Sequence, residues 1–357
     1  MDRRAFLKTG AAFSAAAMAP FSFAAEDKWR TFEVVTRVEL DAAAPAIVWL
    51  PVPSVEADYQ KLLATSFQAD GAAARIVHEP KYGAGILVAE FKGGGKPVVE
   101  LTSRFATRDR AVDLNAAPAA LQLDAAERQR YLAATELLPT DGIVAKTAQE
   151  ITRDARTDLE KARAIYEWIV DNTFRDAKVR GCGVGDIKAM LESNNLGGKC
   201  GDLNALFVGL ARSAGVPARD VYGIRVADSR LGYKSLGKSG DITKAQHCRA
   251  EFYLTGYGWV PVDPADVRKV VLEESGGLPL NDAKVEAARK RLFGSWEMNW
   301  LAFNYAHDLQ LPGTTKGKIG FFMYPNAEVA EQNKMSRLDS LDPENFKYRI
   351  SASEITV

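Results

Sequence analysis

One stretch, residues 197–207, constrains this chain more than any other. Its sequence, Gly-Gly-Lys-Cys-Gly-Asp-Leu-Asn-Ala-Leu-Phe, predicts a glycine-rich turn that delivers Cys200 to the start of a helix. Leu203, Leu206 and Phe207 recur at helical spacing and would bury one face of that helix. Unpaired N–H groups and the helix dipole favour a thiolate in the first turn. The pattern therefore indicates a nucleophile at Cys200, with a small buried cysteine as the alternative.

Length and charge place the chain in a broad class. Its 357 residues suffice for two domains, and 47% hydrophobic with 26% charged residues is typical of a globular protein. Lysine plus arginine equals aspartate plus glutamate, at 46 each. The balance gives no reason to expect a nucleic-acid partner.

The first 25 residues are typical of a twin-arginine export signal. Arg3 and Arg4 precede Phe-Leu-Lys, a short apolar run follows, and the small residues Ser22 and Ala24 suit a signal peptidase. The sequence therefore predicts a periplasmic protein whose signal is removed; an N-terminal anchor helix is the alternative. No later segment has membrane-spanning length, so we expect no stable membrane insertion after signal removal.

The three cysteines allow two arrangements. In an oxidising compartment an odd number leaves at least one thiol free or paired between chains. A disulfide between Cys182 and Cys248 would leave Cys200 free, and three reduced cysteines are the alternative.

Residues 26–120 predict an antiparallel β domain. Apolar and charged residues alternate over residues 32–40, and an apolar run covers residues 46–52. Two further strands, 85–91 and 98–105, flank Gly93-Gly94-Gly95, which predicts a hairpin turn between them.

Residues 121–312 predict a mainly helical core that also holds an antiparallel hairpin, and residues 313–357 a C-terminal β extension. Capping-box patterns begin at Asp124 and Thr157. The predicted helices cover residues 124–138, 143–155, 157–170, 186–191, 200–214 and 282–308, and the predicted tail strands cover 319–324 and 348–355.

Two more residues complete a possible catalytic triad with Cys200. His247 begins a predicted strand, and Asp263 ends the next one after the turn at Gly256-Tyr257-Gly258. An antiparallel pair can bring the two side chains together. A cysteine nucleophile needs a base and the base needs an orienting group. We expect Asp263 to accept the Nδ1–H of His247, which leaves the other ring nitrogen for Cys200.

At this point the chain resembles the transglutaminase-like superfamily of cysteine acyltransferases and peptidases. The resemblance rests on three blocks over about residues 140–270: residues 198–202 with Pro217-Ala218-Arg219 downstream, His247 with its strand, and residues 258–264. It implies an α+β fold with a papain/transglutaminase-like core, in which the Cys helix packs on an antiparallel sheet. It also implies Cys200 as nucleophile, His247 as base and Asp263 as orienting carboxylate.

One position departs from the family pattern. Bacterial members often carry an aromatic residue two positions after the histidine, where this chain has Arg249. The charged side chain either changes the substrate or faces solvent from the opposite side of the strand.

The predicted function is acyl transfer through a Cys200 thioester. Hydrolysis of amide or peptide bonds in a peptide or protein substrate of the cell envelope is favoured, because water is the abundant acceptor there. Transfer to an amine, which would cross-link proteins, and a silent scaffold with the same fold are the alternatives. A zinc site built from Cys182, Cys200, His247 and Cys248 is disfavoured, because adjacent strand residues point to opposite faces. The sequence predicts no cofactor and no metal.

Overall fold

The computed structural model describes residues 28–41, 44–332 and 334–355. The predicted export signal, residues 1–25, lies outside the described residues. Within the described ranges, no helix combines the length and apolar character needed to span a membrane.

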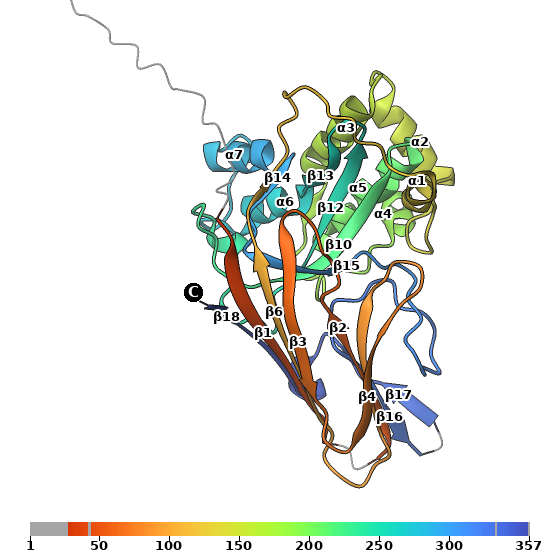
Figure 1. Cartoon of the computed structure of the whole chain (residues 1–357). Helices are drawn as coiled ribbons and strands as arrows, with labels where there is room; N and C mark the ends of the chain where they lie inside the picture. Colours follow the sequence, from red (N-terminus) through yellow and green to blue (C-terminus); the bar gives the residue numbers. More distant parts are fainter. Residues whose placement is uncertain (1–27, 42–43, 333, 356–357) are drawn as a thin grey trace, which may run out of the picture.

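The fold is mixed α and β, as predicted, with helices gathered around one antiparallel sheet and long strands at the other end (Figure 1). The sheet at the helical end has the strand order β13-β12-β10-β15. Its members are β10 (Ala218–Arg225), β12 (Gln246–Leu254), β13 (Gly258–Val262) and β15 (Trp300–Asn304). Strands β12 and β13 form the predicted hairpin that carries His247 and Asp263.

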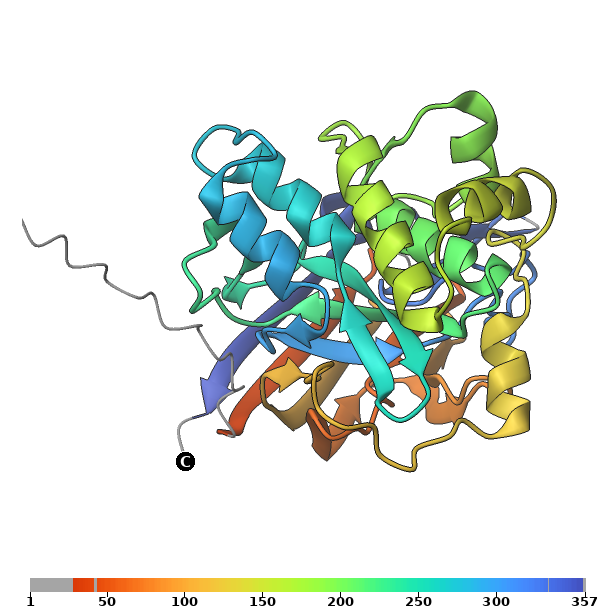
Figure 2. The ribbon, with the colours of Figure 1, turned by 90° about the horizontal axis from the view of Figure 1, so that it is seen from above.

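Helix α5 (Cys200–Ser213) is the centre of the helical end. All of its residues from Cys200 to Arg212 are buried, and it packs against β10 and β12. Figure 2 shows the helices gathered on one side of the strands. The other helices are α1 (Ala125–Leu132), α2 (Gly142–Thr152), α3 (Asp158–Asn172), α4 (Ile187–Ser193), α6 (Pro264–Glu273) and α7 (Ala283–Arg291).

Local sequence explains where these helices begin. The Oγ1 of Thr157 accepts the N–H of Glu160 at 3.2 Å, and the Glu160 carboxylate accepts the N–H of Thr157 at 2.9 Å. This is the capping box predicted from the sequence. Asp124 caps α1 in a similar way through the N–H groups of Ala126 and Glu127. Helix α1 ends earlier than predicted, because Ala133 leaves the helical conformation.

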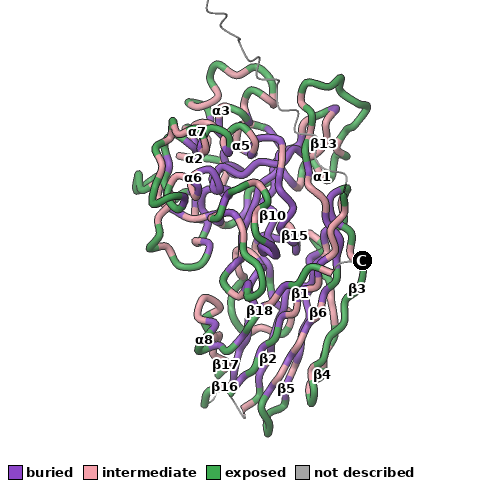
Figure 3. Tube along the Cα trace, turned by 90° about the vertical axis from the view of Figure 1, so that its left-hand side faces the viewer, coloured by how far each residue is buried: buried purple, intermediate pink, exposed green. Residues whose placement is uncertain are grey.

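Two five-stranded antiparallel sheets form the other end of the molecule, and their inner residues share one apolar core. Figure 3 shows burial along their inner strands and exposure along β3 and β4. One sheet contains β1 (Arg30–Glu39), β3 (Gln60–Gln68), β6 (Val98–Thr107), β11 (Gly240–Asp241) and β18 (Tyr348–Ile355). The other contains β2 (Ala46–Val52), β4 (Ala72–His78), β5 (Gly85–Phe91), β16 (Asn326–Glu331) and β17 (Lys334–Arg337).

Strands from the N-terminal and C-terminal parts of the described chain pair in these sheets. Strand β18 pairs with β1, and β16 pairs with β2, so C-terminal strands complete the sheets that begin with β1 and β2. Short strands and helices lie in the segments between these longer elements. They are β7 (Arg110–Ala111), β8 (Phe174–Arg175), β9 (Gly197–Gly198), η1 (Lys234–Leu236), β14 (Ser295–Trp296) and α8 (Pro343–Phe346).

The predicted hairpin across Gly93-Gly94-Gly95 is wrong. Strands β5 and β6 exist, but they belong to different sheets. The connection from residue 92 to residue 97 takes the chain from one sheet to the other. Hairpin loops are usually two to five residues long, so a six-residue connection leaves room for this crossing.

Only the first part of the helix predicted over residues 282–308 is helical in the structure, as α7. After α7, Gly294 adopts a φ of 108°, and the chain enters β14 and β15. The spacing of Trp296, Trp300 and Phe303 imitates a helical stripe. All five residues of β15 are buried, so no alternation marks the strand. The predicted strand 319–324 is also absent; the structure has only an isolated bridge there, between Leu309 and Ile319.

Candidate active site

Cys200 is the first residue of α5, as the sequence predicts. Strand β9 pairs in parallel with β8 immediately before it, and Lys199 is in extended conformation with φ −115° and ψ −163°. The short pairing fixes the chain just before the helix. Cys200 therefore lies at the helix N-terminus, where the macrodipole favours negative charge.

Asp202 is a structural residue at this helix start. Its Oδ2 accepts the N–H of Lys199 at 2.9 Å, and its Oδ1 accepts the N–H groups of Val184 and Gly185, each at 2.9 Å. A side chain at Gly183 would overlap the Asp202 carboxylate. The carboxylate thus ties the preceding loop to α5, which gives Asp202 a structural role at the start of the helix.

One backbone donor at this terminus is available to an oxyanion. The N–H of Gly201 donates to the carbonyl of Cys182 at 2.7 Å, and the N–H of Asp202 donates to the carbonyl of Lys199 at 3.1 Å. Among the described residues, no acceptor pairs with the N–H of Cys200. Of the first three donors of the helix, this is the one that can stabilise charge on a substrate oxygen.

His247 and Asp263 meet in a buried contact. The distance between His247 Nε2 and Asp263 Oδ2 is 2.7 Å, and both side chains are almost fully buried. The expected contact through Nδ1 is wrong, because the ring presents Nε2 to the carboxylate. Nδ1 is therefore the nitrogen left for Cys200.

Asp263 has several further contacts that hold it in place. Its Oδ1 accepts the N–H of Asp266 at 3.0 Å and so caps α6. The same oxygen accepts the side-chain amide of Asn204, at 3.1 Å, and this amide also donates to the carbonyl of Cys248 at 2.8 Å. Asn204 therefore links the helix of Cys200 to the strand of His247 and to Asp263.

A second carboxylate and an arginine lie beside the pair. Asp266 Oδ2 is 3.4 Å from His247 Nε2. Arg225 binds both oxygens of Asp266, at 2.6 Å and 2.8 Å. Burial alone would raise the pKa of Asp266, but Arg225 holds that pKa well below its ordinary value. Asp266 thus stays ionised next to the imidazole.

Arg249 is buried against the site, so the expectation that it could face solvent is wrong. Its Nε is 3.7 Å from Asp263 Oδ2, and its guanidinium lies 4.7 Å from the ring centre of Trp300. Burial lowers the pKa of Arg249 to about 10, which still leaves it charged at neutral pH. Positions two apart in a strand share a face, which is why Arg249 lies on the His247 side.

The three cysteines form one buried cluster without a disulfide. All three are free, and the sulfur atoms of Cys182, Cys200 and Cys248 lie within 4.8 Å of one another. The structure thus has the reduced arrangement, one of the two alternatives. The Cys182 thiol also lies 3.2 Å from the carbonyl of Gln246, and Cys248 lies 3.8 Å from the sulfur of Met323.

The surroundings of Cys200 favour its thiolate. The Cys182 thiol contributes most to lowering the pKa of Cys200 well below its ordinary value, and Cys248 and His247 act in the same direction. The neighbouring Cys200 conversely raises the pKa of Cys182. One thiolate is therefore accompanied by two neutral thiols.

The surroundings of His247 favour its protonated form. Burial and Arg225 would lower the pKa of His247, but Asp266, Asp263 and Cys200 together raise it above the ordinary value. A raised histidine pKa and a lowered cysteine pKa together describe a thiolate–imidazolium pair.

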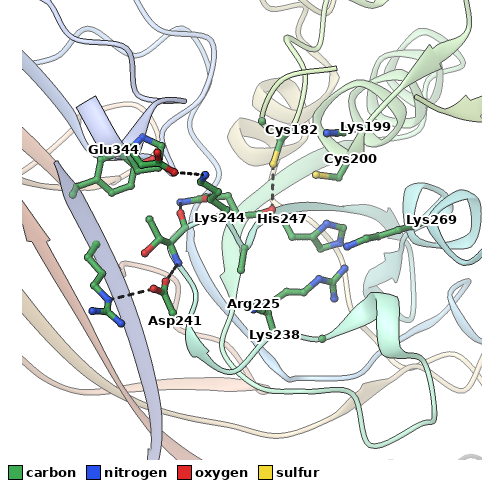
Figure 4. Close-up of a pocket in the computed structure, with 18 of the residues that line it drawn as sticks. Cys182, Lys199, Cys200, Arg225, Lys238, Asp241, Lys244, His247, Lys269 and Glu344 are labelled. Carbon is green, nitrogen blue, oxygen red and sulfur yellow. Dashed lines mark hydrogen bonds and ion pairs between the residues drawn. The ribbon is translucent and has the colours of Figure 1, made fainter. Parts of the chain in front are cut away.

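The site opens into a cavity of about 790 Å³. Figure 4 shows Cys200 above the His247 ring, with Lys269 and Arg225 extending toward the ring. The loop before β12 and the C-terminal residues Tyr348 and Arg349 form part of the wall. The tail therefore shapes the cavity around the predicted nucleophile.

Two groups of side chains have the ligand types that metals use. The three thiols suit a soft ion, and His247 with Asp263 and Asp266 forms the other group. His247 and Cys248 thus fall into different groups. In the second group Arg225 and Arg249 already face the carboxylates, so a further cation would be repelled.

Arg219 belongs to a separate buried cluster. It donates to Glu251 at 2.7 Å, and Arg110 binds the other oxygen of the same carboxylate. Trp259 stacks on the Arg219 guanidinium at 3.9 Å. These contacts give Arg219 a structural role.

Sequence reasoning missed Asn204, Arg225 and Asp266 as neighbours of the triad. Asp266 is three residues after Asp263, in the first turn of a helix, and this spacing could have indicated that the two side chains lie close together. Asn204 is one turn after Cys200 on the same helix. Arg225 ends a strand, and no local pattern marks it.

Comparisons with known proteins identify the family of the chain. The model of the transglutaminase-like superfamily core matches residues 145–264, which include Cys200, His247 and Asp263. An uncharacterized protein of Haemophilus influenzae is 39% identical over 318 residues, covering 84% of both chains. A candidate cysteine protease from Cytophaga hutchinsonii has a similar fold, with a TM-score of 0.58, 13% identity and 92% of each chain covered. The chain therefore belongs to the transglutaminase-like superfamily.

Proposed function

We propose that this protein is a cysteine hydrolase that cleaves amide or peptide bonds through a thioester at Cys200. The observation that carries the proposal is the buried arrangement of Cys200 at a helix N-terminus, with His247 bound to Asp263 at 2.7 Å, at the edge of one cavity. The chain's membership of the superfamily supports a cysteine-dependent enzyme.

The first half of the reaction would form the thioester. The Cys200 thiolate attacks the carbonyl carbon, and the N–H of Cys200 stabilises the oxygen that becomes negative. When this intermediate collapses, the C–N bond breaks. The Nδ1 proton of the His247 imidazolium goes to the leaving amine, while Asp263 holds Nε2.

The second half would regenerate the enzyme. Neutral His247 takes a proton from water through Nδ1, and the hydroxyl oxygen attacks the thioester carbon. The C–S bond then breaks, which releases a carboxylic acid and restores the thiolate–imidazolium pair.

Water is the acceptor that the cavity favours. Charged and polar side chains dominate its wall, and such side chains favour the entry of water. Transfer to an amine requires exclusion of water from the thioester. We therefore favour hydrolysis over cross-linking.

The proposed substrate is a peptide or protein of the cell envelope. The twin-arginine pattern at residues 1–25 supports export to the periplasm, and the released protein would act there.

Trapping the thioester tests the proposal. Purified protein is mixed with a peptide library and hydroxylamine, and the products are read by mass spectrometry. We expect new carboxylates without hydroxylamine and hydroxamates with it, and neither product from Cys200→Ala. Products that persist in Cys200→Ala would overturn the proposal.

A further inference from the structure

The cavity at Cys200 carries a strong excess of positive charge. Seven lysine or arginine residues line it, against two carboxylates, Asp241 and Glu344. The cationic residues are Arg175, Lys199, Arg225, Lys238, Lys244, Lys269 and Arg349. The chain as a whole has equal numbers of acidic and basic residues, so this excess is local.

Some of these charges are already compensated. Arg225 binds Asp266, Lys244 lies 3.2 Å from Glu344, and Arg349 lies 3.3 Å from Asp241. These pairs help to shape the wall.

Other charges remain for a ligand. Among the described residues, neither Lys199 nor Lys238 forms an ion pair with a carboxylate. Arg175 and Lys269 pair with the same carboxylate, that of Glu273, with 3.7 Å between Lys269 Nζ and Glu273 Oε2. Asp266 also faces Lys269, but Arg225 already binds both of its oxygens. That cluster keeps a net positive charge beside the His247 ring, toward which Lys269 extends (Figure 4).

These charges lie on several sides of the predicted nucleophile. Lys199 directly precedes Cys200, Lys238 comes from the loop before β11, and Lys269 comes from α6. Positive charges gathered around one cavity raise the local concentration of an anionic ligand there. A substrate with basic side chains next to the scissile bond would be repelled.

We propose that this cavity selects acidic peptides, with a carboxylate next to the bond that Cys200 attacks. The proposal rests on the proposed hydrolase function and adds the substrate class. The carboxylate is either an Asp or Glu side chain or the C-terminus of the peptide, and Lys199, Lys238 and Lys269 bind it.

The first experiment needs no turnover. Alkylation of Cys200 by iodoacetate, which is anionic, is compared with alkylation by neutral iodoacetamide, and Cys200 is followed by peptide mass spectrometry. We expect the iodoacetate/iodoacetamide rate ratio to exceed that of free cysteine. Lys238→Met should lower it by about fivefold, the order of effect expected from removing one nearby charge in a partly hydrated site. The ratio should also fall with added salt.

Matched variants make this result specific. Lys96 is an exposed lysine in the connection between β5 and β6, and Lys96→Met should leave the ratio unchanged. Lys199→Met gives a second measurement at a half-buried position. A ratio equal to that of free cysteine, or unchanged in both cavity variants, would overturn the proposal.

Peptide binding to Cys200→Ala separates the sources of the carboxylate. Fluorescence anisotropy is measured for a peptide with Glu residues, its Gln counterpart, and each with a free or amidated C-terminus. Tighter binding of the Glu peptides assigns the side chain, and tighter binding of the free acids assigns the C-terminus. Equal binding of all four overturns the proposal. A failure of amide cleavage combined with preferred acidic binding overturns only the hydrolase function.

Discussion

His247 presents Nε2, not Nδ1, to Asp263, at 2.7 Å from the carboxylate oxygen. In the proposed mechanism, this orientation leaves Nδ1 for the cysteine and the substrate, and Asp263 holds the ring through Nε2. Asp266, 3.4 Å from the same nitrogen, is already bound by Arg225. The two carboxylates near the imidazole therefore have different tasks, which substitution can separate.

Asp263→Asn should lower kcat by about 10²- to 10⁴-fold, because an amide no longer stabilises the imidazolium in its correct orientation. Asparagine keeps Oδ1, so the cap of α6 survives and the protein should fold. The measurement is kcat for peptide cleavage, with circular dichroism to check the fold. Asp282→Asn changes the N-cap of α7 and serves as control. Unchanged kcat in Asp263→Asn contradicts the assigned role.

The pH dependence of Cys200 alkylation tests the ion pair. The pKa of Cys200 is lowered, chiefly by Cys182, and the pKa of His247 is raised, so thiolate and imidazolium coexist between the two values. Reaction with iodoacetamide should rise with pH well below the free-thiol pKa of about 8.5. His247→Ala removes the imidazolium and should shift the profile to higher pH. Labelling of the unmodified protein only above about pH 8 refutes the pair.

Cys182 should act on the nucleophile more strongly than Cys248. The Cys182 thiol is the largest contributor to the lowered pKa of Cys200. Cys182→Ala should therefore shift the alkylation profile of Cys200 upward by more than Cys248→Ala does. Cys182→Ser keeps a hydrogen-bond donor and should recover part of the shift. An equal effect of both alanine variants would show that the two thiols are interchangeable.

We expect Arg249 to stabilise the fold, although it does not line the cavity at Cys200. It faces the buried Asp263 from 3.7 Å and stacks near Trp300. Arg249→Met leaves a buried carboxylate with less compensation and should cost about 3–5 kcal/mol of unfolding free energy. Arg249→Lys keeps the charge and should cost less. Urea denaturation measures both, and equal losses would mean that packing, not charge, is the reason.

The sequence predicts the triad because each member lies in a recognisable local pattern. Cys200 follows a glycine turn, and His247 and Asp263 lie on a hairpin. The features that the sequence does not predict depend on contacts between residues far apart in the chain. Strands β16 and β18 complete sheets with β2 and β1, and Arg225 approaches Asp266 from a strand 41 residues earlier. The ring orientation of His247 follows from packing that no spacing encodes.

The cluster of Glu251 between Arg110 and Arg219 gives a last test, because it is buried apart from the site. Burial alone would raise the pKa of Glu251, but Arg219 and Arg110 lower it below the ordinary value. A lowered carboxyl pKa stabilises the fold above the unfolded pKa of about 4.3, and this stability is lost as the pH falls toward the folded value. Glu251→Gln leaves two buried guanidinium groups and should cost about 3–5 kcal/mol at neutral pH.

The matched control for this change is Glu90→Gln. Glu90 pairs with Arg75 on the surface, at 2.8 Å, with both side chains exposed. Such pairs contribute less than about 1 kcal/mol. Urea denaturation at pH 7 and again at pH 4 gives the comparison. The difference in unfolding free energy between Glu251→Gln and the unmodified protein should be smaller at the lower pH, since part of the stability that Glu251 supplies is then lost. If this difference in unfolding free energy does not change with pH, the destabilisation comes from altered packing and not from the lost carboxylate charge.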